Sequence, residues 1–170
     1  APVAGPQPYD WGRVSRQLVL PEFGDEAQRR LAGARVLIVG AGGLGCTCAP
    51  LLAGAGVGTI GLVDDDLVEL SNLHRQVAHR TATVGRPKVD SLAEALEALN
   101  PDVRVNRHQL RLTASHAAEL FAHYDLVIDG GVCPGGVASS VVRVGQNGAL
   151  EILRDGAIDA ETLRRAAAGG

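Results

Sequence analysis

A glycine-rich run in the first third of the chain places the strongest constraint on how this sequence can fold. Arg35-Val-Leu-Ile-Val39 is the pattern of a buried strand, Gly40-Ala-Gly-Gly-Leu-Gly45 follows it directly, and small residues from Cys46 to about Ala55 predict a helix. The pattern G-x-G-x-x-G between a strand and a helix is typical of a phosphate-binding turn, because glycines allow a tight turn and let an anion approach the unpaired N–H groups of the helix. The alternative is that the glycines serve helix–strand packing alone. The glycines expected at the phosphates of a nucleotide are Gly40, Gly42, Gly43 and Gly45.

A second strand is expected from Thr59 to Val63, and it ends on three aspartates, Asp64-Asp65-Asp66. Asp64 lies 19 residues after Gly45. A carboxylate at the end of the second strand can accept hydrogen bonds from both hydroxyls of a ribose. We therefore expect a nucleoside with free hydroxyls, and to this point NAD and ATP fit equally well.

Strand and helix patterns alternate through the middle of the chain. This alternation predicts an α/β fold, a Rossmann-like, doubly wound, mostly parallel sheet with helices on both faces. The alternation of strand and helix patterns stops beyond Gly130, so the sheet is expected to be truncated and to end in a hairpin and a short helix. The further elements expected are an amphipathic stretch from about Arg13 to Leu31, helices at about Pro87 to Leu99 and Ala114 to Ala122, strands at Val103 to Val105 and Asp125 to Asp129, hairpin strands at Ser140 to Val144 and Leu150 to Leu153, and a terminal helix at Ile158 to Ala168.

Composition narrows the class of protein. With 170 residues, 46% of them hydrophobic, the chain can build one sizeable core but not two ordinary enzyme domains. A net charge of −3 argues against nucleic acid and membrane surfaces as partners, since both select basic proteins. No apolar run approaches the roughly 20 residues of a membrane helix, and Ala1 to Pro8 lack the pattern of a secretory signal, so we expect a cytoplasmic location. Three cysteines without a C-x-x-C pair predict reduced thiols and no structural zinc, with Cys46 and Cys48 in the core.

Two further segments favour ATP over NAD. Ser71-Asn-Leu-His-Arg-Gln76 and Gly85-Arg-Pro-Lys88 offer amides and cations suited to a triphosphate, for which a nicotinamide enzyme has no need. Arginine outnumbers lysine 15 to 1, and the single lysine is Lys88, just inside a helix that Pro87 can begin. A compact ammonium can sit between phosphate oxygens where a planar guanidinium is too broad. The position of Lys88 therefore indicates a phosphate contact, although one lysine must also fall somewhere by chance.

The motifs, taken in order, resemble those of the ThiF/MoeB-type, ubiquitin-activating-like adenylyltransferases. The similarity covers about residues 9–130 and implies the family's fold, its use of ATP and Mg²⁺ and its homodimeric assembly. We accordingly expect a flexible arm at 1–12, a ThiF/MoeB-like ATP-binding domain at 13–130, and an atypical hairpin-plus-helix tail at 131–170 that packs on or extends the same domain. The segments that carry the resemblance are Arg13-Val-Ser-Arg-Gln17, Gly40–Gly45, Asp64–Gln76 and Gly85–Lys88.

The resemblance also implies a reaction and a set of roles. The C-terminal glycine carboxylate of a small sulfur-carrier or ubiquitin-like protein attacks the α-phosphate of ATP and gives an acyl-adenylate and pyrophosphate. Because a carboxylate is already ionised at neutral pH, no general base is needed, so the histidines at 79, 108, 116 and 123 are expected to be ordinary surface or boundary residues. By matching position, the implied catalytic residues are Arg16 (in the partner subunit's site), Arg75 and Lys88; the implied nucleotide contacts are the four glycines, Asp64 at the ribose, and Ser71, Asn72, Arg75 and Lys88 at the phosphates.

One family feature does not match. An Asp-Asn pair that holds Mg²⁺ should follow the strand that ends at Asp129, yet Val132-Cys133 stands at that spacing. Asp129 is the remaining candidate metal ligand, although as a strand end it can equally cap a loop. The leading hypothesis is an ATP-dependent adenylyltransferase. The first alternative is a catalytically incomplete ATP-binding module or a regulator that heterodimerises with a full-length relative. The second alternative is an NAD-dependent oxidoreductase, which leaves Arg75 and Lys88 unexplained.

The tail resembles a different family. Asp129–Val144 and Ile152–Ile158 look like the closing segment of YrdC-type threonylcarbamoyl-AMP synthases. That resemblance implies a serine, Ser139 or Ser140, and Arg154 near a nucleotide. The alternative is a hairpin that covers the open edge of the sheet.

Overall fold

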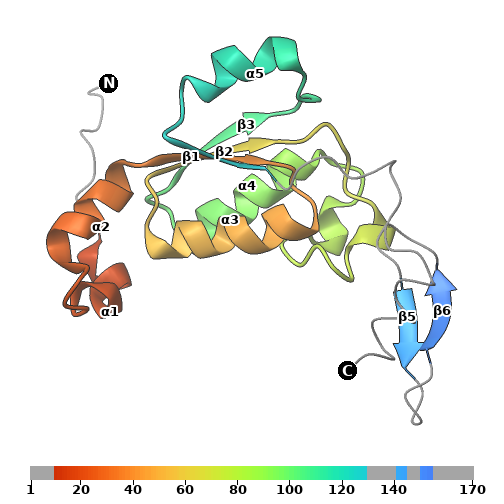
Figure 1. The fold of residues 1–170 in the computed structure, drawn as a ribbon, viewed down its shortest axis with the longest axis horizontal. Coiled ribbons are helices and arrows are strands. Elements are labelled where there is room, and N and C mark those ends of the chain that lie inside the picture. The colour runs from red at the N-terminus through yellow and green to blue at the C-terminus, as the bar shows by residue number, and fades with distance from the viewer. Residues whose placement is uncertain (1–9, 130–140, 145–149, 155–170) are drawn as a thin grey trace. The chain divides into compact units, whose positions relative to one another are not determined.

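The computed structural model describes residues 10–129, 141–144 and 150–154 (Figure 1). The chain divides into two compact units, Ala1–Gly130 and Gly131–Gly170, and each is described by itself. All the motifs that indicate a nucleotide lie in the first unit.

Four strands form the sheet of the first unit. They are β1 (Arg35–Val39), β2 (Thr59–Val63), β3 (Arg104–His108) and β4 (Leu126–Asp129). All pairings are parallel, in the spatial order β3-β2-β1-β4. Val39 lies opposite Val63 on one side and opposite Asp129 on the other, so the carboxyl ends of these strands meet at one edge. The chain leaves β1 in one direction for β2 and β3 and returns on its other side as β4, and ligands of open α/β sheets bind at such a switch point.

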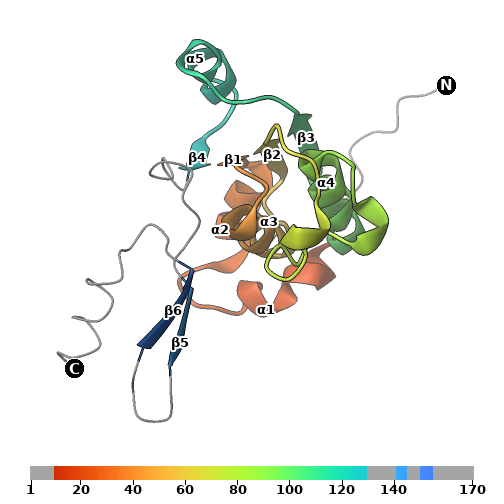
Figure 2. The ribbon, with the colours of Figure 1, turned by 90° about the vertical axis from the view of Figure 1, so that its right-hand side faces the viewer.

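Helices cover both faces of this sheet. They are α3 (Gly43–Ala55), α4 (Lys88–Leu99) and α5 (Ala114–Phe121), with short 3₁₀ turns η2 (Leu70–Asn72) and η3 (Thr81–Thr83). Figures 1 and 2 show α3 and α4 on one face and α5 on the other, which confirms the doubly wound prediction. The core lies between the sheet and the α3–α4 layer, where each fully buried aliphatic side chain contributes about 1.5–3 kcal/mol. Its largest side chains include Ile38, Ile60, Leu62, Leu92 and Leu96.

The N-terminal stretch expected from about Arg13 to Leu31 is divided rather than continuous. It forms a 3₁₀ turn η1 (Trp11–Val14), a single turn α1 (Ser15–Leu18) and a separate helix α2 (Gly24–Gly33). Pro21 lies in the break, and a proline cannot donate the helical hydrogen bond and clashes with the carbonyl four residues earlier. Gln17 still ties the pieces together, because its Nε2 donates to Gln28 Oε1 at 2.9 Å and to the Ala55 carbonyl at 3.1 Å.

The second unit contains two described strands, β5 (Val141–Val144) and β6 (Leu150–Arg154), which pair antiparallel with a register shift between Val141 and Val142. The expected hairpin strands are therefore present. The expected helix at Ile158–Ala168, the residues Ser139 and Ser140, and the Val132-Cys133 pair lie outside the described residues. Among the helices that the structure describes, none combines the length and the apolar character needed to cross a membrane.

Candidate nucleotide-binding site

The glycine turn lies at the carboxyl end of β1 and leads directly into α3. Gly40 donates its N–H to the Val63 carbonyl at 2.7 Å and takes a left-handed φ of 97°, which a side chain would strain. Helix α3 begins at Gly43, three residues earlier than expected, because the turn itself is already helical there. The N–H groups of its first turn have no partner within the helix, and with the helix dipole they favour an anion.

Glycine is required for different reasons at different positions of this turn. At Gly45 an added Cβ would lie 2.0 Å from the Gly40 carbonyl oxygen, so packing alone requires this glycine. At Gly43 an added Cβ would meet nothing within 4 Å among the described residues, and at Gly42 only Gln76 Nε2, at 3.7 Å. Neither of these two has a positive φ. Packing within the described residues therefore explains Gly45 but leaves Gly42 and Gly43 as an open cradle that side chains would fill, which is what a phosphate site needs.

Asp64 is held against the glycine turn. Its Oδ2 accepts the Ala41 N–H at 2.7 Å and its Oδ1 accepts the Asp66 N–H at 2.8 Å. An ionised carboxylate has about four acceptor positions, so both oxygens retain the capacity to accept a ribose hydroxyl. A hollow of about 170 Å³ opens beside it, lined by Val39, Gly40, Val63, Asp64, Asp65, Asp66, Leu110 and Leu112.

Lys88 is buried at the first residue of α4, with 7% of its side chain exposed. Its Nζ donates to Asp66 Oδ2 at 2.6 Å, and the same aspartate accepts the Lys88 N–H through its backbone carbonyl at 3.0 Å. A buried ammonium requires such a partner, because desolvation of an unpaired charge is strongly unfavourable. The Asp66 carboxylate is 64% exposed, so an incoming anion can compete with it for the ammonium.

The segment from Ser71 to Gln76 follows β2 and presents both exposed and buried groups. Arg75 is exposed and donates from Nη1 to the Ser71 carbonyl at 3.1 Å, while the Ser71 hydroxyl donates to Glu69 Oε2 at 2.9 Å. Asn72 is buried, and its Oδ1 has no hydrogen-bond partner within residues 10–129. The Ser71 hydroxyl and the Arg75 guanidinium thus bond to neighbouring residues, and the Asn72 Oδ1 is unpaired among the described residues. None of these three groups forms an ion pair in the described part of the chain.

Arg16 is separated from the other predicted site residues. It lies exposed on α1, whose neighbouring Gln17 contacts Ala55 at the C-terminal end of α3. The glycine turn is at the opposite end of this 13-residue helix, about 20 Å away along its axis. Arg16 therefore cannot reach the glycine turn of its own chain.

Asp129 lies at the candidate site. It ends β4 directly opposite Val39, so this residue is at the switch point, where the glycine turn begins. A second source of oxygen ligands is the group Asp64, Asp65 and Asp66, whose carboxylate atoms lie within 4.8 Å of one another. Mg²⁺ takes one or two protein carboxylates together with phosphate oxygens and water, so the acidic side chains present fit this ion.

The expectation that His79 is an ordinary surface or boundary residue is wrong. His79 is 5% exposed, its Nε2 lies 3.0 Å from the Ala41 carbonyl, and its Nδ1 lies 3.0 Å from Ser91 Oγ. Burial lowers the pKa of His79, which favours the neutral ring. The imidazole therefore ties the glycine turn to α4, a role that only the tertiary contact with Ala41 reveals.

Two other titratable groups follow the expectations. Cys46 is buried as predicted, and its thiol donates to the Ala41 carbonyl at 3.3 Å. Burial raises the pKa of Cys46 to about 11, so the thiol is protonated at neutral pH. His108 is half-buried, with Nε2 2.9 Å from Tyr124 Oη, and burial lowers its pKa as well.

A parallel sheet whose switch point carries a glycine cradle, a tethered aspartate and a buried lysine defines a Rossmann-like nucleotide-binding domain. The particular family follows from the sequence. The model of the ThiF family matches residues 14–131, and the chain belongs to this family.

Relatives with curated names agree with this assignment. "Adenylyltransferase and sulfurtransferase uba4" of Emericella nidulans is 56% identical over 120 residues, which are 71% of this chain and 25% of that protein. "Probable adenylyltransferase/sulfurtransferase MoeZ" of Mycobacterium tuberculosis is 53% identical over 118 residues, which are 69% of this chain and 30% of that protein. The chain thus spans about a quarter of the length of the curated relatives it matches.

A solved structure of E. coli MccB with ATP has a similar fold. It superposes with a TM-score of 0.65 at 28% sequence identity and covers 75% of this chain and 40% of that one. The family match ends at residue 131, so the resemblance of the tail to YrdC-type synthases stays a prediction.

Proposed function

We propose that this chain is the nucleotide-binding part of an ATP-dependent adenylyltransferase that activates the C-terminal glycine carboxylate of a small sulfur-carrier or ubiquitin-like protein. The observation that carries the proposal is the open cradle at Gly42 and Gly43 beside a buried Lys88. The names of the uba4 and MoeZ relatives and the ATP complex of MccB support the same reaction class. Reduced thiols such as Cys46 suit a cytoplasmic location, which belongs to the same proposal.

The proposed chemistry joins two anions. A carboxylate oxygen of the carrier attacks the α-phosphorus, the bond from that phosphorus to the bridging oxygen breaks, and pyrophosphate leaves with the electron pair. The first turn of α3 and Asn72 bind the phosphates, Asp64 orients the ribose, and the charges of Arg75 and Lys88 stabilise the anionic transition state. Mg²⁺, held by Asp129, would neutralise further phosphate charge when bound.

Lys88 is preorganised for this role. Its ammonium is already dehydrated and fixed by Asp66, so little reorganisation accompanies its transfer to a phosphate oxygen. The exposed Asp66 carboxylate can return to water at small cost, whereas the buried ammonium cannot.

The proposal includes a homodimer in which Arg16 completes the partner's site. Support comes from the distance of Arg16 to its own glycine turn and from the apolar outer face of α3, where Leu44 is 78% and Leu51 70% exposed. Two copies packed with antiparallel α3 helices would bring the Arg16 end of one helix to the glycine turn of the other.

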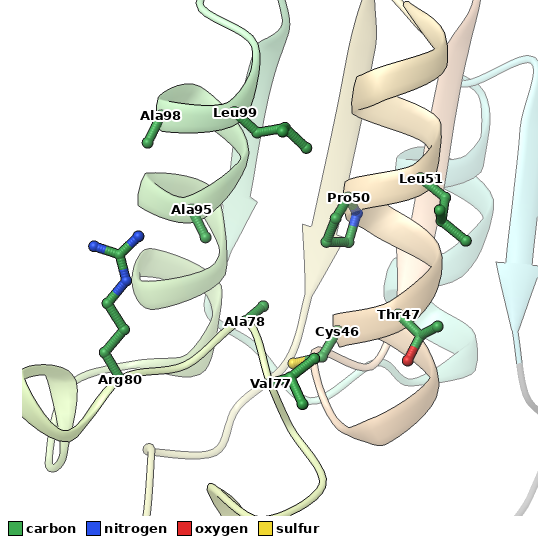
Figure 3. A pocket seen from close by; sticks show the side chains of 10 residues that line it. All are labelled: Cys46, Thr47, Pro50, Leu51, Val77, Ala78, Arg80, Ala95, Ala98 and Leu99. Carbon is green, nitrogen blue, oxygen red and sulfur yellow. The ribbon is translucent and has the colours of Figure 1, made fainter.

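A groove of about 560 Å³ continues this apolar surface between α3 and α4. Figure 3 shows Leu99 of α4 and Pro50 of α3 facing each other across it, with the loop that carries Val77 at one end. Contiguous apolar surface of this kind marks interaction sites. The lining residues are Cys46, Thr47, Pro50, Leu51, Val77, Ala78, Arg80, Ala95, Ala98 and Leu99.

A second candidate function is an ATP-binding module, or heterodimerising regulator, without turnover. It is favoured by Val132-Cys133, which stand where the family's metal-binding pair is expected and offer no hard oxygen ligand from their side chains. Binding and catalysis would then separate, since the cradle, Asp64 and Lys88 can hold ATP without the metal ligand.

ATP–pyrophosphate exchange distinguishes the two functions. Calorimetry with ATP and NAD first tests binding, and exchange is then measured with a panel of small carrier proteins that end in Gly-Gly. Exchange that needs Mg²⁺, ATP and a carrier and is abolished by Lys88→Ala supports the enzyme. Tight ATP binding with background exchange supports the module, and equal affinity for ATP and NAD refutes both.

A further inference from the structure

Gln76 is a buried polar residue whose side chain makes no hydrogen bond within the described structure. It is 4% exposed, yet its carboxamide makes no hydrogen bond with any residue of 10–129, and its Oε1 is fully buried without a partner. Buried polar groups are nearly always hydrogen-bonded, because an unsatisfied amide is destabilising. A glutamine in such a position lowers stability and therefore indicates a role in contact with a group outside the described residues.

The side chain is aimed at the glycine cradle. Beyond the chain neighbours of Gly42, Gln76 Nε2 is the one described atom within 4 Å of the position that a Cβ on Gly42 would occupy, at 3.7 Å. Gly42 precedes the first residue of α3, where the unpaired N–H groups of the helix begin. The amide N–H₂ of Gln76 thus faces the same space as these N–H groups.

The backbone holds Gln76 in this place. Its N–H donates to the Asn72 carbonyl at 3.0 Å, so the two residues are one helical turn apart and share a face. Asn72 has an unpaired Oδ1 as well. Asn72 is thus a second buried amide with unused capacity, one turn from Gln76, and the donors of Gln76 point into the cradle.

We propose that Gln76 is a further nucleotide-binding residue, which donates an amide N–H to a phosphoryl oxygen held in the glycine cradle. This inference rests on the proposed function, because that function places a nucleotide phosphate there. An ionised phosphate offers only acceptors, so it pairs with the Nε2 donors of Gln76, which face the cradle. The buried Oε1 stays unpaired in this contact, and this unsatisfied acceptor is the stability cost that the Gln76→Met comparison measures.

The test compares two buried glutamines with opposite expectations. Gln76→Met keeps the length of the side chain and removes an unsatisfied amide, so the melting temperature should rise, by about 2–4 °C for a chain of this size. Gln28→Met removes an amide that is satisfied, since Gln28 Nε2 donates to the Ala55 carbonyl at 3.1 Å and Oε1 accepts from Gln17, so its melting temperature should fall. Gln76→Leu serves as a second variant of different shape.

Calorimetry with ATP, AMP and adenosine supplies the second measurement. Gln76→Met should bind ATP and AMP about 10- to 150-fold more weakly, the range of a charge-assisted hydrogen bond, and adenosine as the wild type does. Gln28→Met should bind all three ligands unchanged. The pattern expected is thus a variant that is more stable but binds phosphate less well.

Three results would overturn the inference. A fall in melting temperature for both Gln76 variants, with unchanged ATP binding, would show a structural residue. Unchanged ATP binding with a raised KM for the carrier would assign Gln76 to the carboxylate instead. Absence of ATP binding by the wild-type chain would overturn the proposed function together with this inference, whereas the first two results leave the proposed function intact.

Discussion

Replacement of Lys88 by arginine provides a sharp test of the phosphate site, because the substitution keeps the charge. The Lys88 side chain is 7% exposed and its ammonium fits against Asp66 at 2.6 Å. A guanidinium is longer and planar, and forcing extra atoms into a packed position typically costs about 1–3 kcal/mol. We therefore expect Lys88→Arg to lower stability and to displace the charge from the place where the phosphate is held.

The expected loss of ATP binding follows from the lost contact. A charge-assisted hydrogen bond contributes about 1.5–3 kcal/mol, so ATP should bind about 10- to 150-fold more weakly to Lys88→Arg. Lys88→Met should show a similar loss of affinity with little loss of stability, since the exposed Asp66 carboxylate regains water and the buried charge is gone.

The matched control is Arg86→Lys, the reverse exchange two residues earlier. Arg86 is 44% exposed and forms a surface ion pair with Glu94, a type of contact that contributes about 0–1 kcal/mol. Isothermal titration of ATP into the three variants, with melting curves for each, measures both quantities. A loss of ATP affinity in Arg86→Lys that equals or exceeds the loss in Lys88→Arg would remove Lys88 from the site.

Three further predictions concern other groups of the site. Asp64→Ala should weaken ATP by about 1.5–3 kcal/mol and also lower the melting temperature, since the Ala41 and Asp66 N–H groups lose their acceptor; unchanged ATP affinity would refute the ribose role. The lowered pKa of His79 means that the unfolded chain binds more protons below the ordinary value of 6.5, so the contribution of His79 to stability is present above that pH and is lost as the pH falls through its folded pKa. Denaturant titrations from pH 7.5 to 5 should therefore show a stability advantage over His79→Asn that shrinks with acidity, and a constant advantage would contradict the neutral ring. An Arg16→Ala chain mixed with a Lys88→Ala chain should recover one intact site per heterodimer in pyrophosphate exchange, and no recovery after proven subunit exchange would reject the trans-acting arginine.

The sequence by itself determined the order of the strands and helices of the parallel sheet, but not the division of the N-terminal stretch into η1, α1 and α2. Strands β1 and β2 occupy the predicted residues because a short apolar run bounded by glycine or aspartate is a local signal. The glycine turn between β1 and α3 was likewise predictable, since its requirements at Gly40 and Gly45 are those of the backbone itself. Helix α4 begins within one residue of the prediction because Pro87 cannot continue a preceding helix but can begin one.

Tertiary structure alone decided which side chains meet. The pairing of Lys88 with Asp66 joins residues 22 apart and depends on how β2 and α4 pack. The burial of His79 is accompanied by a contact with the Ala41 carbonyl, 38 residues away. The unsatisfied amide of Gln76 is recognisable only once its surroundings are known. Residue type and spacing report the local preference of the backbone, but burial, partners and unsatisfied hydrogen bonds are properties of contacts between distant segments. For this reason the positions of the glycines and Asp64 at the ends of β1 and β2 could be predicted by pattern. The distance of Arg16 from the glycine turn of its own chain was implied by the family resemblance alone, and the orientation of Gln76 could not be predicted.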